Sequence, residues 1–62
     1  MKFSWTYENG EARCEWGKFA LFASRNRCFV MQGGIEVASE RTETMMEGIL
    51  FCENYILKRG IV

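Results

Sequence analysis

Residues 3–16 read FSWTYENGEARCEW, and this stretch decides the fold. It contains two runs with apolar side chains at alternate positions, separated by Asn9-Gly10. Asn-Gly is the strongest short-range signal for a β-hairpin, because a type I′ turn needs a positive φ at both central residues. A two-residue loop places six side chains on one face of the hairpin, in three cross-strand pairs: Tyr7 with Ala12, Trp5 with Cys14, and Phe3 with Trp16.

The chain continues after Trp16 as GKFALFAS, with Gly17 as its one turn residue. Because a single glycine inside a strand pattern often marks a bulge, we predict one bent strand over 11–24 with a bulge near residue 17. The alternative is two separate strands joined by a tight corner at Gly17. Both interpretations leave the same side chains on the same face.

Two further turn signals divide the segment that follows. SRNR (24–27) predicts a turn before the strand RCFVMQ (27–32), and Gly33-Gly34 predicts another before the strand IEVAS (35–39). With the first strand at about 2–8, the expected sheet has four strands. Ten side chains are expected on its inner face: Phe3, Trp5, Tyr7, Cys14, Trp16, Phe19, Leu21, Val30, Ile35 and Val37.

The apolar period changes after residue 42. Met45, Ile49, Cys52 and Ile56 recur at helical spacing, which predicts a helix over about 43–59. We expect Thr42 to be its N-cap, and Gly60 is the residue where it should end. The expected fold is a single α+β domain over residues 1–62: a four-stranded antiparallel β-meander with one C-terminal helix packed on one sheet face.

A single helix leaves the outer sheet face uncovered. Cross-strand pairing predicts an apolar cluster there: Phe22 opposite Phe29, and Ala20 opposite Met31. Contiguous exposed aromatic surface on a small protein marks an interface. The alternative is a shifted register that turns Phe22 inward. The rest of the outer face is polar, with Ser4, Thr6, Arg13 and Glu15 at the first hairpin.

The predicted helix also has more apolar residues than one sheet requires. Met46, Leu50 and Leu57 lie together on a helical wheel, beside the stripe that faces the core. They are either additional apolar residues at the border of the core, beside a wide sheet, or a second contact face. The simplest partner for such a face is a second copy of the chain in a symmetric dimer.

Composition narrows the function classes. The chain has 62 residues and formal net charge +0, which argues against duplex DNA or an anionic membrane as a partner. It contains no His and no Asp, so histidine triads, ordinary zinc sites and aspartate-centred magnesium sites are excluded. No catalytic spacing is present among the remaining types. We therefore expect no enzyme activity, no metal and no cofactor.

Cysteine usage and hydropathy indicate a compartment. Cys14, Cys28 and Cys52 are an odd number with no CxxC pair, so we expect reduced, buried thiols. The start, MKFSWTYENG, has no apolar run of signal-peptide length, and no segment approaches the ~20 residues of a membrane span. The expected location is the cytoplasm.

The segment 28–57, CFVMQGGIEVASERTETMMEGILFCENYIL, resembles small proteins of bacteriophages and other mobile elements. Such proteins combine an aromatic strand, a glycine turn, a strand ending in V-A-S, a Ser/Thr cap and an amphipathic helix. Some anti-CRISPR proteins are single β-meander–helix domains of this size without enzymatic residues. The resemblance implies an inhibitor in the host cytosol. Because this chain is neutral, it implies occlusion of a protein surface more than mimicry of nucleic acid.

These observations lead to one hypothesis and two alternatives. The hypothesis is a non-enzymatic protein-binding module that occludes a host defence complex, with Phe22, Phe29 and Met31 as apolar anchors and Arg25 and Arg27 at the rim. The first alternative is a sheet that binds single-stranded nucleic acid through the hairpin aromatics with Lys18, Arg25 and Arg27. The second is a homodimer in which the helix stripe and the outer cluster cover each other.

Overall fold

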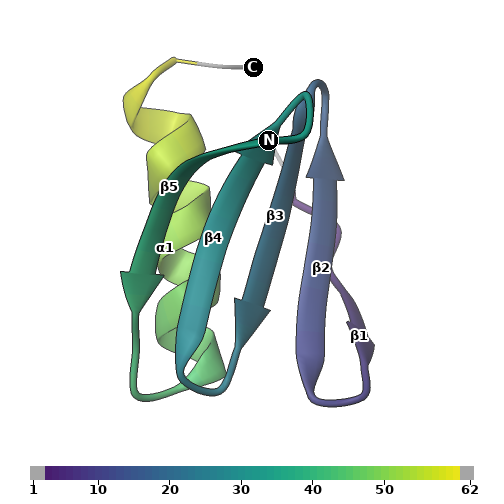
Figure 1. Cartoon of the computed structure of the whole chain (residues 1–62), viewed down its shortest axis with the longest axis vertical. Coiled ribbons are helices and arrows are strands. Elements are labelled where there is room, and N and C mark those ends of the chain that lie inside the picture. The colour runs from purple at the N-terminus through teal and green to yellow at the C-terminus, as the bar shows by residue number, and fades with distance from the viewer. Residues whose placement is uncertain (1–2, 61–62) are drawn as a thin grey trace.

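The computed structural model describes residues 3–60 as a β-sheet with one helix behind it (Figure 1). Five antiparallel strands follow one another in the sheet in chain order. They are β1 (Thr6–Glu8), β2 (Glu11–Trp16), β3 (Phe19–Ser24), β4 (Arg27–Gln32) and β5 (Ile35–Arg41). The helix α1 (Met45–Lys58) packs on one face, mainly across β3 and β4. The predicted α+β meander with a C-terminal helix is confirmed, but the sheet has five strands and not four.

The extra strand arises at Gly17, where the predicted single strand over 11–24 is wrong. Trp16 pairs with Phe19, so Gly17-Lys18 forms a two-residue hairpin loop between β2 and β3. Gly17 has φ +59° and Lys18 does not have a positive φ, which fits the first central position of a type II′ turn. One glycine is therefore enough to reverse the chain here. The alternative with a tight corner is correct, and the buried series keeps its face.

The first hairpin is shorter than predicted. Asn9 (φ +53°) and Gly10 (φ +78°) form the expected turn, and Tyr7 pairs with Ala12. However, β1 begins at Thr6, so Phe3 and Trp5 do not belong to the ladder as predicted. Residue 2 lies outside the described part of the chain. Phe3 instead packs on the ring of Trp16, at 4.5 Å between centroids, and Trp5 donates its indole N–H to Glu53 of α1 at 2.8 Å.

A β-bulge in β5 overturns another part of the predicted inner face. Val30 pairs with Ala38 and Met31 with Glu36, so Val37 is an extra residue with no partner in the ladder. The bulge turns Ala38 toward the core in place of Val37, which is 37% exposed. Ile35 and Tyr7, also predicted as inner residues, are 68% and 63% exposed because α1 does not extend over the two sheet edges.

The core lies between α1 and the three central strands. Its side chains are small or medium in size, and no polar or charged residue among those described is buried with them. The sheet contributes Ala12, Cys14, Leu21, Ala23, Cys28 and Val30, and the helix contributes Ile49, Cys52 and Ile56. Of the predicted inner aromatics, Phe3, Trp5, Trp16 and Phe19 are partly buried at the border of this core.

Helix α1 begins at Met45, later than the predicted start at about residue 43. Thr44, not Thr42, is the N-cap, and its hydroxyl accepts a hydrogen bond from the Glu47 N–H at 3.2 Å. Thr42 instead donates its own N–H to the Asn26 carbonyl at 3.1 Å, which ties it to the β3–β4 loop. At the other end Gly60 has φ +67° and stops the helix, as predicted.

The two threonines should respond in opposite ways to removal of the hydroxyl. Thr44→Ala is expected to lose about 1 kcal/mol, because it removes the N-cap. The Thr42 Oγ1 is buried without a hydrogen-bond partner in the described structure, so Thr42→Val is expected to be neutral or stabilising by up to about 1 kcal/mol. Urea denaturation of both variants tests this assignment. A loss for Thr42→Val as large as that for Thr44→Ala would identify Thr42 as the cap.

Candidate binding surface

The sheet face opposite α1 carries no covering element in the described structure (Figure 1). We call it the outer face. One cross-strand row runs through its centre, with one residue from each strand in register: Thr6, Arg13, Phe22, Phe29 and Ser39. The row exists because these positions alternate with the buried ones along each strand. The predicted pair Phe22–Phe29 therefore lies in the middle of an uncovered sheet, and the register that would turn Phe22 inward is wrong.

The two phenylalanines form a stacked pair. Their ring centroids are 4.9 Å apart at an interplanar angle of 18°, and both side chains are half-buried. Ala20 and Met31 pair next to them, as predicted, and are also half-buried. Four apolar side chains from β3 and β4 thus form a contiguous patch, which we call the central patch.

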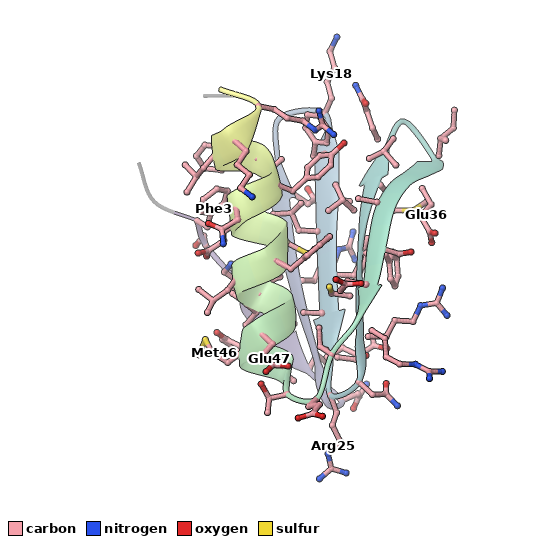
Figure 2. All side chains as sticks on the ribbon, turned by 90° about the vertical axis from the view of Figure 1, so that its left-hand side faces the viewer. Phe3, Lys18, Arg25, Glu36, Met46 and Glu47 are labelled. Atoms are coloured by element: carbon pink, nitrogen blue, oxygen red, sulfur yellow. The ribbon has the colours of Figure 1, made fainter. Side chains whose placement is uncertain are left out.

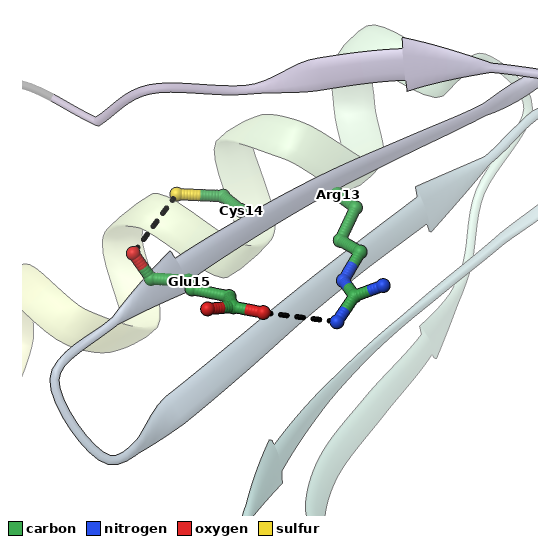
Figure 3. A network of polar contacts seen from close by, with 3 residues as sticks. All are labelled: Arg13, Cys14 and Glu15. Atoms are coloured by element: carbon green, nitrogen blue, oxygen red, sulfur yellow. Dashed lines mark hydrogen bonds and ion pairs between the residues drawn. The ribbon is translucent and has the colours of Figure 1, made fainter.

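Arg13 completes the stack on the side of β2. Its guanidinium carbon lies over the Phe22 ring at 5.6 Å from the centroid, within the range of a cation–π contact. Figure 3 shows the same guanidinium paired with the Glu15 carboxylate at 2.9 Å, while the Cys14 side chain points to the helix side of the strand. Phe22 therefore has Phe29 of β4 on one side and Arg13 of β2 on the other, and Arg13 also forms an exposed ion pair with Glu15.

A groove runs along the outer face between β1 and the central patch, with a volume of about 640 Å³. Three of its eight lining residues are glutamates, against one arginine. Its walls are formed by Ser4, Thr6, Glu8, Asn9, Glu11, Arg13, Glu15 and Phe22. The groove is acidic on the β1–β2 side, and it meets the apolar patch at Phe22.

The basic residues predicted at the rim do not form one cluster. Arg27 pairs with Arg41 across β4 and β5, so both belong to the outer face. Arg25 lies in the β3–β4 loop beside Glu43 and Thr44, away from the central patch. Figure 2 shows Lys18 and Arg25 at opposite ends of the molecule. Lys18 is therefore separated from Arg25, so the predicted group of Lys18, Arg25 and Arg27 does not come together.

Two arginines of this surface were not among the predicted contact residues. Arg13 had been placed on the polar part of the outer face, and the cross-strand position opposite Phe22 is the signal that could have shown its role. Arg41 was missed because the fourth predicted strand ended at residue 39. The bulge at Val37 also reverses the alternation beyond it, which a strict two-residue period does not reveal.

The predicted stripe on the helix is also exposed. Met46, Leu50 and Leu57 are 59%, 50% and 50% exposed. Figure 2 shows Met46 and Phe3 on the same side of the helix. The hydrogen bond from Trp5 to Glu53 ties the chain before β1 to the helix next to this stripe. The stripe is therefore separate from the outer face, on the other layer of the domain.

The three cysteines are free and buried, as predicted. Burial raises the pKa of all three thiols, and for Cys52 it raises the pKa to about 12. The Cys52 thiol points to the carbonyls of Phe22 and Phe29, at 3.6 and 3.7 Å. A protonated, enclosed thiol is a poor nucleophile, so these cysteines act as small core residues.

Among residues 3–60, no group of three His, Cys, Asp or Glu side chains is arranged to hold a metal ion. In the same part of the chain, no helix has the length and apolar character needed to cross a membrane. Comparisons with known protein families, with curated proteins and with solved structures found no match.

Proposed function

We propose that this chain is a non-enzymatic protein-binding module and that the outer face is its contact surface. The observation that carries the proposal is the stacked Phe22–Phe29 pair in the middle of a sheet face that no described element covers. Aromatic and methionine side chains are enriched at the centres of protein interfaces, where a surrounding polar rim excludes water. Met31 and Ala20 extend the apolar centre, and Arg13 and Arg27 lie at its border.

The arrangement of the rings favours a protein over single-stranded nucleic acid. A base must stack on a free ring face. The Phe29 ring stacks on Phe22 at 4.9 Å, and the Arg13 guanidinium carbon lies over the Phe22 ring at 5.6 Å, so both compete with a base for this ring. Glu8, Glu11 and Glu15 line the adjacent groove and would repel a phosphate backbone. We therefore do not propose a nucleic-acid partner.

The resemblance to anti-CRISPR-type proteins supports a more specific form of the same proposal. A small domain with an apolar centre and a mixed-charge rim inhibits a larger complex by covering the surface that the complex needs. It requires neither a catalytic residue nor a cofactor. In this form the target is a host defence complex, and the anchors are Phe22, Phe29 and Met31.

Photo-crosslinking from the outer face tests the proposal. A benzoylphenylalanine at Met31 is expected to give covalent adducts with protein in cells that express the variant. The matched control carries the same probe at Lys58, which lies in the last turn of α1, away from the central patch. Adducts at position 31 that resist nuclease and are absent at position 58 would support the proposal. Adducts that nuclease removes, or no adducts at position 31, would overturn it.

A further inference from the structure

One row of the outer face carries charges of opposite sign at its two edges. On one side Glu8 of β1 pairs with Glu11 of β2, and on the other Arg27 of β4 pairs with Arg41 of β5. The register continues from Glu11 to Ser24 at the end of β3, and all four charged residues are exposed. The row therefore reads, from β1 to β5, as two negative charges, one neutral serine and two positive charges.

Both edges of this row are unfavourable within a single chain. Like charges directly opposite each other on neighbouring strands destabilise a sheet. Among residues 3–60 the sole ion pair is the one between Arg13 and Glu15, so neither the glutamate pair nor the arginine pair is neutralised within that range. The glutamate pair and the arginine pair lie on opposite sides of β3, the same number of strands away from it, and carry charges of opposite sign.

We infer that the partner of the outer face is a second copy of this chain, related by a two-fold axis that runs along β3. Such an axis lays the β1 edge of one copy over the β5 edge of the other. Glu8 then faces Arg41 of the second copy, and Glu11 faces Arg27. Each contact occurs twice, so four like-charged neighbours become four ion pairs. This inference rests on the proposed function, because it names the protein that the outer face binds, and it puts a second copy in the place of the host defence complex on that face.

The central row is compatible with the same axis. Phe22 of the two copies meet at the two-fold, and Phe29 of each copy faces Arg13 of the other. Thr6 faces Ser39. An isologous interface of this kind is the commonest symmetry of soluble oligomers. Two sheets packed face to face form a sandwich whose strands run nearly parallel, which the axis along β3 provides.

The expected dimer is weak. The molecule measures 26 × 20 × 19 Å, so one face offers a projected area on the order of 500 Å² per partner, below the ~800 Å² of a standard interface. Exposed ion pairs add little net affinity but strongly select orientation. We expect association at micromolar to millimolar concentration that weakens as salt is added. The stripe of Met46, Leu50 and Leu57 stays uncovered in this dimer.

Two charge-reversal variants test the inference. The first carries Glu8→Arg and Glu11→Arg, so that its row has positive charge at both edges. The second carries Arg27→Glu and Arg41→Glu, so that its row has negative charge at both edges. Each variant keeps a like-charge pair at each edge, so neither gains or loses a pairing within one chain. Circular dichroism establishes that both fold.

Sedimentation velocity gives the readout. The unmodified chain is expected to dimerise, each variant alone is expected to stay monomeric, and an equimolar mixture of the two is expected to form a heterodimer at least as tight as the unmodified dimer. An unmodified chain that stays monomeric up to millimolar concentration, or a mixture that does not associate, overturns the inference. The proposed function fails separately, when the probe at Met31 forms no protein adduct. A monomer whose probe captures a different protein refutes the second copy alone.

Discussion

A Gly48→Val protein is expected to lose about 3 kcal/mol of folding free energy, because overpacking at a rigid contact outweighs the slightly better helix propensity of valine compared with glycine. Gly48 is buried where α1 crosses the sheet. A Cβ at this position would lie 3.0 Å from the Cβ of Cys28 and 3.1 Å from the Cβ of Ala23. Both neighbouring atoms are attached directly to strand backbone, so neither can rotate away. The helix or the strands must move.

Alanine at the same position is expected to destabilise the protein less than valine does. Gly→Ala in a helix interior normally stabilises by about 1 kcal/mol, whereas overpacking costs about 1–3 kcal/mol. We expect Gly48→Ala to be destabilising by about 1 kcal/mol overall, the reverse of its intrinsic preference.

Guanidinium denaturation measures both Gly48 variants against a matched control. Asn54→Val places the same β-branched side chain on the exposed side of α1, where it meets no strand. The Gly48→Val midpoint is expected far below that of Asn54→Val. Equal midpoints would mean that the helix does not approach β3 and β4 this closely.

The contact at Gly48 shows where sequence reasoning reaches its limit. The 3.6-residue period correctly identified the core stripe through Ile49, Cys52 and Ile56. Gly48 directly precedes Ile49 of that stripe. The period describes one element alone, so it does not contain the distance between the helix and the sheet. Only the packed structure shows that the helix lies close to Ala23 and Cys28 at Gly48.

The turns also include some that the sequence determines and some that it does not. Asn9-Gly10 and Gly33-Gly34 supply a positive φ at both central residues, and their turns were predicted correctly. Gly17-Lys18 supplies one, and the apolar alternation on either side fits a bulged strand as well as a hairpin. The bulge at Val37 has no local signal, because Ile35 and Val37 already alternate as a regular strand would.

The residues of the candidate surface could be predicted from the sequence wherever the pairing register of the strands could be predicted. Pairing across the Arg25-Asn26 loop placed Phe22 opposite Phe29 and Ala20 opposite Met31, as the structure has them. The charged border was not predictable, since Arg41 lies beyond the bulge and Arg25 turns out to lie next to the helix start. Apolar pairs follow from local alternation, whereas the rim depends on where the sheet ends.

A comparison of two adjacent residues on β3 tests that register directly. Leu21 is fully buried, and Phe22 is half-buried on the outer face. Leu21→Ala is expected to lose about 3–4 kcal/mol, through lost burial and the cavity left behind. In a domain this small, such a loss leaves much of the chain unfolded at room temperature.

Phe22→Ala removes the larger side chain and is expected to lose less, about 1–2 kcal/mol, because its ring contributes one stacked pair and one cation–π contact on an open face. Thermal unfolding monitored by circular dichroism compares the two variants, with Phe29→Ala as the partner control for the stack. Phe22→Ala and Phe29→Ala should retain a cooperative transition that Leu21→Ala largely loses. If the phenylalanine variants unfold and Leu21→Ala does not, the faces of β3 are exchanged. The central patch would then belong to the core, and the outer face would have no apolar centre with which to bind a protein.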